Sequence, residues 1–267
     1  MYRGVRMAVV DLPFCTMPST TGDALVLRSY DLGETSRIVV FLTRDRGKVR
    51  AVAKGARGGR PRYQSALEPL SEVRIGLHGR QGTELFRLGA CELLHSAFPA
   101  GAAGLEASLF LSYLAELLDA FAQEGEAEDA VYRLALAAVR ATESGIPEPL
   151  LVRYVEAWLL RLDGVYPPLD RCASCAAVLP AGRLVYHDAA HGFVCENCGP
   201  ATGPVLSEDA RGLLVEVFRR SPGDLPRGAN EGVAVLEGFH QMLLSRHLER
   251  PLRSHQVLKD VAREMKG

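Results

Sequence analysis

The pattern of hydrophobic and polar positions changes once along the chain. Up to about residue 95, apolar residues form short runs or alternate with polar ones, and after Pro99 they recur every three or four positions. A period of two is typical of half-exposed strands, whereas a period of 3.6 is typical of helices. The pattern therefore predicts an N-terminal β domain followed by a helical region.

Five segments of the first part have strand patterns. In the third, alternation places Lys48 and Arg50 on one face and turns Val49 toward the core. The glycine-rich segment 55–61 cannot continue a strand and predicts a flexible basic loop. Five short strands with a long loop between the third and fourth indicate an OB-type barrel, although an SH3-like barrel has a similar strand count. The strands are expected at 24–30, 37–43, 47–54, 71–77 and 84–94.

The helical part contains recognisable start and stop signals. Pro147 occupies a favoured first-turn position, Gly164 ends the same helix, and Ser207 is a suitable N-cap. The apolar residues on these helices are expected to form an ordinary core. Helices are predicted at 105–123, 126–143 and 147–163, then after Ser207, and finally at 230–250.

Between the predicted helices lie four cysteines in two C-x2-C pairs. Two residues between thiols allow one tight turn to present both sulfurs to one metal ion, and two such turns complete a tetrahedron. The spacing predicts one structural Zn²⁺ per chain in a zinc ribbon. A four-thiolate site has no open coordination position, so it supports structure and not chemistry. The expected ligands are Cys172, Cys175, Cys195 and Cys198.

Two other interpretations of these cysteines are open. Two disulfides would require an oxidising compartment, and nothing in the sequence indicates export. His187 and His191 lie between the pairs and could compete as ligands, but four thiolates make them unnecessary.

The sequence thus predicts an α+β protein in which a five-stranded OB-type barrel precedes a helical domain carrying an inserted four-cysteine ribbon. The expected organisation is a flexible leader (1–21), an OB-fold domain (22–98), a first helical part (99–165), the zinc ribbon (166–204) and a second helical part (205–267).

Composition agrees with a globular protein of two or three domains, since 48% of the 267 residues are hydrophobic and 24% are charged. No apolar run approaches the roughly 18 residues that a membrane span needs. The first residues also lack a signal-peptide pattern, so the expected location is cytoplasmic, with no membrane partner.

The net charge of −1 conceals a strong asymmetry. Residues 1–95 carry a charge of +6 and the remainder −7. Within residues 37–62, only Asp45 opposes nine basic side chains. A concentrated basic stripe attracts phosphate backbones, although it could also bind an acidic protein surface or nothing specific. The candidate DNA-binding residues from this stripe are Arg37, Lys48, Arg50, Lys54, Arg57, Arg60 and Arg62.

No common catalytic motif is present. The sequence has no phosphate-binding P-loop, no G-x-G-x-x-G fingerprint, no H-E-x-x-H and no G-x-S-x-G. We therefore expect a binding protein without catalytic residues, a nucleotide cofactor or a small-molecule substrate. A metal-dependent nuclease or transferase is a less favoured alternative.

Several segments together resemble the bacterial recombination mediator family RecO. They are Ala24–Glu34, Val40–Thr43 with Arg46-Gly47, Val52–Arg57, and Trp158–Cys172 leading into the ribbon. The resemblance covers roughly residues 22–255.

This resemblance implies an OB fold, a helical domain and, in many members, a zinc ribbon. It also implies binding of single- and double-stranded DNA, annealing of complementary strands, and action with RecR and the single-stranded-DNA-binding protein to help load recombinase. The matching positions that inherit the DNA-binding role are Lys48, Arg50, Lys54 and Arg57, whereas Arg37, Arg60 and Arg62 are proposed from charge alone. The main alternative is an adaptor whose basic barrel face docks an acidic partner.

Overall fold

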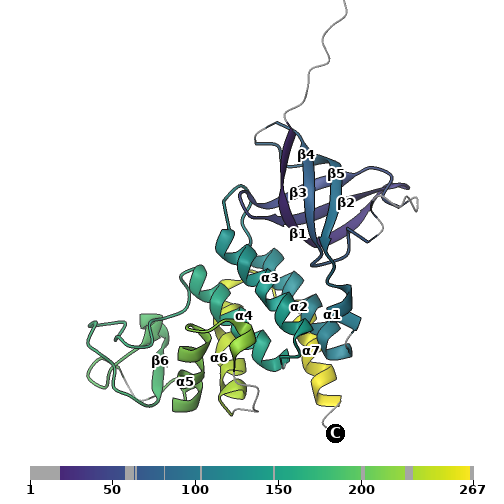
Figure 1. Ribbon diagram of the computed structural model, residues 1–267. Coiled ribbons are helices and arrows are strands. Elements are labelled where there is room, and N and C mark those ends of the chain that lie inside the picture. Colours follow the sequence, from purple (N-terminus) through teal and green to yellow (C-terminus); the bar gives the residue numbers. More distant parts are fainter. Residues whose placement is uncertain are drawn as a thin grey trace, which may run out of the picture.

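A computed structural model describes residues 19–57, 63, 65–80, 82–102, 104–146, 148–199, 202–225 and 231–264. A β-barrel lies at one end of a helical body, and a small three-stranded ribbon lies at the other end (Figure 1). This arrangement confirms the predicted fold class.

The barrel consists of β1 (Ser19–Leu32), β2 (Ser36–Thr43), β3 (Gly47–Ala53), β4 (Glu72–His78) and β5 (Phe86–His95). Its closed order is β1-β2-β3-β5-β4, and β1 pairs antiparallel with both β2 and β4. A short parallel pairing of Ala51 with Phe86 and of Val52 with Arg87 closes the barrel. A five-stranded closed barrel agrees with the OB-type prediction.

The middle of β1 (24–27) and the second half of β2 (39–43) do not show polar alternation because both faces of the strands are buried there. In β1, Ala24 and Val26 belong to the core inside the barrel, whereas Leu25 and Leu27 join the core of the helical body. Neighbouring strand residues point to opposite faces, so a strand covered on both sides reads as a continuous apolar run. In β3 the apolar side chains alternate with half-exposed ones, as predicted.

The predicted leader is too long by three residues. Residues Ser19 to Thr21 form the start of β1, where they pair with the end of β4. Their polar side chains lack a strand pattern, and they are held in the barrel by backbone pairing with β4 and by a hydrogen bond from Arg46 Nη2 to the Thr20 hydroxyl at 3.1 Å. The other predicted domain limits stay predictions.

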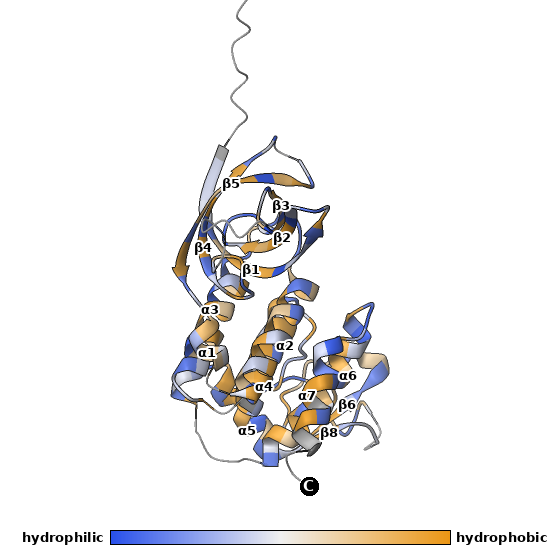
Figure 2. Ribbon diagram, turned by 90° about the vertical axis from the view of Figure 1, so that its right-hand side faces the viewer, coloured by the Kyte–Doolittle hydropathy of each residue, from blue (hydrophilic) through white to orange (hydrophobic). Residues whose placement is uncertain are grey.

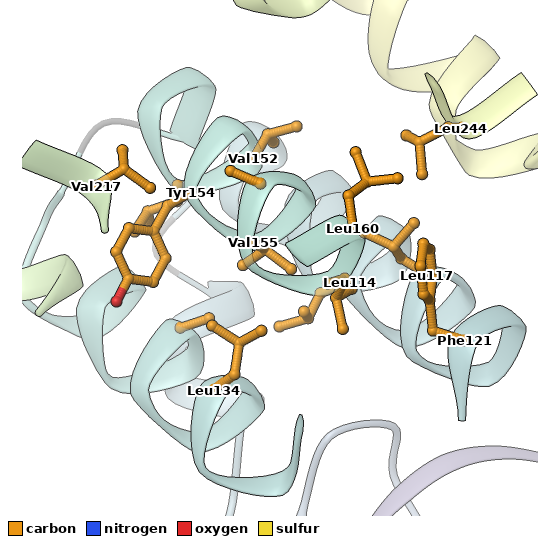
Figure 3. Close-up of a cluster of buried hydrophobic side chains, with 14 of the residues drawn as sticks. Leu114, Leu117, Phe121, Leu134, Val152, Tyr154, Val155, Leu160, Val217 and Leu244 are labelled. Carbon is orange, nitrogen blue, oxygen red and sulfur yellow. The ribbon is translucent and has the colours of Figure 1, made fainter. Parts of the chain in front are cut away.

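Seven helices occur in the described residues, and η1 (Asp188–Ala190) and η2 (Pro222–Asp224) are short 3-10 turns. Their apolar faces converge on one core, in which Leu114 and Leu117 lie near Leu160 (Figure 3). In Figure 2 the hydrophobic stripes of α2 and α4 run through the helical body. The helices are α1 (Phe98–Ala102), α2 (Leu105–Phe121), α3 (Asp129–Glu143), α4 (Glu148–Leu162), α5 (Glu208–Val217), α6 (Glu231–His247) and α7 (Arg253–Glu264).

The C-terminal helix prediction was incomplete. The helix expected to reach residue 250 ends at His247, and a separate α7 begins at Arg253 after Pro251. Proline disfavours helical geometry in the residue before it, which explains the break. The short α1 was also missed. Ser207 does cap α5, because its hydroxyl oxygen accepts a hydrogen bond from the amide of Ala210 at 3.3 Å.

The ribbon consists of β6 (Leu184–His187), β7 (Gly192–Phe193) and β8 (Val205–Leu206), with β6 in the centre. It leaves the bundle after α4 and returns before α5, and α6 packs against both of these helices. The ribbon is therefore an insertion within one helical bundle, as predicted. None of the helices in the described part of the chain combines the length and apolar character needed to cross a membrane.

Candidate metal centre and nucleic-acid interface

The structure brings the four predicted cysteines together. The Sγ atoms of Cys172, Cys175, Cys195 and Cys198 all lie within 4.8 Å of one another. The Sγ atoms of Cys175 and Cys195 are 3.7 Å apart. Four sulfurs at about 2.3 Å from a central zinc ion stand about 3.8 Å from each other, so this spacing fits a tetrahedral metal.

Local backbone geometry shapes both cysteine turns. Ala176 follows Cys175 with a φ of 59°, and its amide donates to the Cys172 carbonyl at 2.9 Å. In the second turn, the amide of Cys198 donates to the Cys195 carbonyl at 3.0 Å. These tight turns explain why two intervening residues suffice to place two thiols side by side.

The cluster contains one thiol that favours negative charge and one that resists it. The amides of Cys195 and Cys175 lower the pKa of Cys172 to about 6, and the Cys195 amide lies 3.3 Å from its sulfur. The neighbouring thiols of Cys175 and Cys195 raise the pKa of Cys198 to about 12. The four sulfurs are not disulfide-bonded, and neither His187 nor His191 belongs to the cluster. The donor set thus fits a thiolate-bound metal.

Contacts from two helices fix the ribbon to the bundle. The Arg211 guanidinium of α5 donates to the carbonyls of Leu169, Pro180 and Gly182 at 2.8, 2.5 and 3.1 Å. Phe193 of β7 stacks on Phe239 of α6 with ring centroids 5.5 Å apart. Sequence reasoning missed these anchors because their partners are backbone oxygens and residues distant along the chain.

The predicted basic stripe is divided between two locations. Lys48 and Arg50 face the helical body, as Nζ of Lys48 donates to the Asp119 carbonyl at 2.7 Å and Arg50 pairs with Glu124 at 2.6 Å. The Lys48 side chain is only 16% exposed. Lys48 is thus engaged in the contact between barrel and helices and is poorly placed to reach a ligand.

Asp119 is the centre of this contact. Its side chain is 7% exposed and lies near three cations: Arg28 Nε at 3.2 Å, Lys48 Nζ at 3.7 Å and Arg250 Nη2 at 3.9 Å. These cations come from β1, from β3 and from the segment before α7. One carboxylate therefore links two strands of the barrel to two parts of the helical body.

The second location is the barrel end at the β1–β2 turn, where Arg37, Lys54 and Arg57 form what we call the turn cluster. Arg37 and Arg57 flank the carboxylate of Asp31, each at 3.5 Å, and both are 40% exposed. Nη1 of Arg57 also donates to the Gly33 carbonyl at 2.9 Å. Lys54 directly follows β3 and is exposed. Arg60 and Arg62 lie outside the described residues.

One aromatic side chain near this end is available for stacking. Tyr30 is 43% exposed and the Arg28 guanidinium lies 5.9 Å from its ring centroid, whereas Phe41 and Tyr63 are buried. Aromatic side chains on a basic barrel surface are a common means of holding unpaired bases.

The helical core contains a buried polar network that the sequence analysis did not identify. Glu156 and His240 are fully buried and 3.0 Å apart, and Glu156 also accepts from Tyr113 at 2.6 Å and from Arg153 at 3.2 Å. Tyr166 lies 3.1 Å from the second imidazole nitrogen. The sequence signal that could have revealed this network is the charged Glu156 among the apolar residues of α4. No substrate could reach these groups, so the network is structural.

Burial sets the protonation of this network. Burial raises the pKa of Glu156, but Arg153 and the hydrogen bond from His240 outweigh it and hold that pKa below its usual value. Burial lowers the pKa of His240, despite the neighbouring Glu156. The histidine is therefore neutral at a pH at which an exposed histidine would still be partly charged.

Comparison with known proteins agrees with this two-part architecture. Residues 17–97 match the family model described as "Recombination protein O N terminal", and residues 103–256 match "Recombination protein O C terminal". The chain is 35% identical over 234 residues to a protein of Koribacter versatilis named "DNA repair protein RecO", covering 86% of this chain and 94% of the relative.

Two further relatives carry the same name. The protein of Desulforudis audaxviator is 37% identical over 249 residues, covering 89% of this chain and 95% of its own length. The protein of Geobacter metallireducens is 32% identical over 249 residues, covering 92% and 99% respectively. The similarity thus spans both the barrel and the helical region.

Proposed function

Because the chain belongs to the RecO family of DNA repair and recombination proteins, we propose that it binds DNA through its barrel and anneals complementary strands without catalysing a reaction. The observation that carries this proposal is the turn cluster, in which Arg37 and Arg57 flank the carboxylate of Asp31 and the exposed Lys54 follows β3 at the same end of the barrel. Cations placed at one end of a barrel attract phosphates of any base sequence.

Binding of this kind supports annealing by a simple electrostatic route. Two complementary strands repel each other, and a surface that neutralises phosphates on both strands reduces this cost. The turn cluster supplies three cations for this purpose, with Asp31 between two of them. Tyr30 supplies one exposed ring beside the same hairpin, so a single base could stack there while the backbone contacts the cations. No nucleotide hydrolysis is required.

We propose that the four cysteines hold one structural Zn²⁺. The support is the sulfur spacing, which fits a tetrahedral site, and the two backbone turns that prepare it. When bound, the metal supplies a crosslink between the two halves of the ribbon. Since all four thiols are ligands, no coordination position is left for water or substrate.

The family further suggests RecR and the single-stranded-DNA-binding protein as partners, with a role in loading recombinase on coated DNA. We expect single- and double-stranded DNA to be bound in the cytoplasm, at the nucleoid. The acidic half of the chain, with a net charge of −7 after residue 95, is better suited to protein partners and to architecture than to DNA.

Annealing of two complementary oligonucleotides, followed by the fluorescence of a donor–acceptor pair, tests this function. At low salt the protein should accelerate annealing without ATP, and the acceleration should fall at high salt because screening weakens the attraction between protein and strands. Binding to DNA with no acceleration would restrict the function to DNA binding. Absence of DNA binding, together with binding to an acidic protein, would favour the adaptor.

A further inference from the structure

A pocket outside the barrel combines unpaired cations with an aromatic wall. It lies between the end of α4, the segment leading to the ribbon and the end of α5, and has a volume of about 440 Å³. This volume is within the range of small-ligand sites. Its lining includes Arg161, Tyr166, Pro168, Asp170, Phe218 and Arg219.

The two arginines of this pocket differ from most arginines in the described part of the chain. Neither Arg161 nor Arg219 forms an ion pair with a carboxylate of the described residues, whereas the adjacent Arg220 pairs with Glu216. The Arg161 guanidinium instead lies 4.3 Å from the ring centroid of Phe218 and 5.6 Å from that of Trp158. Two guanidinium groups at one pocket are thus free to bind an anion.

Their surroundings indicate which anion fits. An arginine held against aromatic rings keeps its planar donors pointing outward, which suits the oxygens of a phosphate. The half-buried ring of Phe218 and the neighbouring prolines offer flat apolar surface to a planar ring. Asp170 repels a second phosphate but can accept a hydrogen bond from an exocyclic amino group.

We propose that this pocket binds one nucleotide unit of single-stranded DNA, with its phosphate between Arg161 and Arg219 and its base against Phe218. A phosphodiester strand carries one charge and one planar ring per unit, which matches the two kinds of surface in the pocket. The inference rests on the proposed DNA-binding function and adds a second contact, on the helical body, to that of the barrel.

The chain contains a natural reporter for this pocket. Trp158 is its single tryptophan, and its ring lies 5.5 Å from that of Phe218 in an edge-on arrangement. A strand that enters the pocket and moves Arg161 should change tryptophan fluorescence, whereas a strand held only by the barrel should not. Fluorescence anisotropy of a labelled oligonucleotide measures total binding in parallel.

The experiment compares the full-length protein with the double variant Arg161→Gln/Arg219→Gln, using a short oligodeoxycytidylate, whose bases carry an exocyclic amino group. Arg183→Gln is the matched control, because Arg183 is exposed, lies outside the pocket and pairs with no carboxylate of the described residues. We expect the double variant to lose the tryptophan signal, to bind about tenfold more weakly and to reduce the salt slope by about 0.7, since the one phosphate held between the two arginines contributes about 0.7 on a single strand. Arg183→Gln should retain the tryptophan signal.

Several results would overturn the inference. One is a wild-type protein that binds the oligonucleotide by anisotropy with no tryptophan response, which leaves the barrel function intact. Another is an acidic peptide of equal charge that changes the fluorescence as strongly as DNA does. If the wild type fails to bind DNA at low salt, both the inference and the proposed function fail. If the double variant does not fold, the same measurements are made with Arg219→Gln alone, which removes no contact with Trp158.

Discussion

Nζ of Lys48 in β3 donates to the backbone carbonyl of Asp119 in α2 at 2.7 Å. Lys48, which belongs to the alternating basic pattern of β3, thus connects the barrel to the helical body. Lys48 therefore contributes to the stability of the fold, whereas the nearby Lys54 is exposed. We expect substitutions of these two lysines to differ in their effect on stability.

Lys48→Met should lower the free energy of unfolding by about 1–3 kcal/mol, because it removes a donor from a carbonyl and one cation from the poorly exposed Asp119. Lys54→Met changes an exposed side chain and should stay within about 0.5 kcal/mol of the wild type. Urea unfolding of both variants measures the difference. Equal stability of the two variants would show that the Lys48 contact does not hold the barrel in place.

Gly47→Ala should destabilise the same junction. Gly47 has a φ of 59°, and an added Cβ would lie 2.3 Å from the Glu126 carbonyl oxygen and 2.4 Å from that of Gln123. Gly33→Ala is the control, since Gly33 has a φ of 62° but no atom within 4 Å of the added Cβ. In the control, backbone strain alone should lower the free energy of unfolding, by about 1–2 kcal/mol. Gly47→Ala should lower the free energy of unfolding by more. If the two variants have the same melting temperature, the backbone of Gly47 does not lie as close to the carbonyls of Gln123 and Glu126 as the structure indicates.

Cys195→Ser should release the metal and unfold the ribbon while leaving the barrel folded, because binding energy at such a site is folding energy for the local unit. The measurement is zinc content by elemental analysis together with hydrogen exchange in β6 and β1. Cys91→Ser, which changes a cysteine outside the cluster, should retain zinc. If elemental analysis finds no zinc in wild-type protein purified under reducing conditions, the metal assignment is wrong.

The buried network predicts a loss of stability in mild acid. The folded-state pKa of His240 is lowered by burial, so protonation favours the unfolded chain, and stability falls as the pH drops below the ordinary value of 6.5. His240 faces Glu156, Tyr166 and, further away, Arg153. His240→Gln should be less stable than the wild type at pH 8 but lose less stability between pH 8 and pH 5.5. Thermal melting at several pH values measures the stability of both proteins. If the stability of both declines equally as the pH falls, His240 does not have this role.

Much of the fold could be predicted because its signals are local. The alternation around Lys48 and Arg50 identified β3, the N-cap at Ser207 identified α5, and the two C-x2-C pairs identified the four clustered thiols. Each of these signals depends on neighbours a few positions away, which a single sequence displays directly.

The remaining features depend on distant pairs. The engagement of Lys48 depends on Asp119, which is 71 positions away, and the burial of Glu156 depends on His240, which is 84 positions away. The sequence shows a positive charge on a strand but not which carboxylate approaches it. For this reason the basic stripe was predicted as one surface, whereas the structure divides it between the helical junction and the turn cluster.

The central claim is that the turn cluster carries the DNA affinity of the barrel. The most direct measurement is the salt dependence of binding to oligonucleotides of unrelated sequence, for the wild type, for Arg37→Ala/Lys54→Ala/Arg57→Ala and for the exposed control Arg133→Ala in α3. The triple variant should bind every sequence more weakly, and its slope of log K against log salt should be shallower by about 2–3, because each lost phosphate contact removes about 0.7–0.9. A folded triple variant with wild-type affinity and slope would contradict the claim.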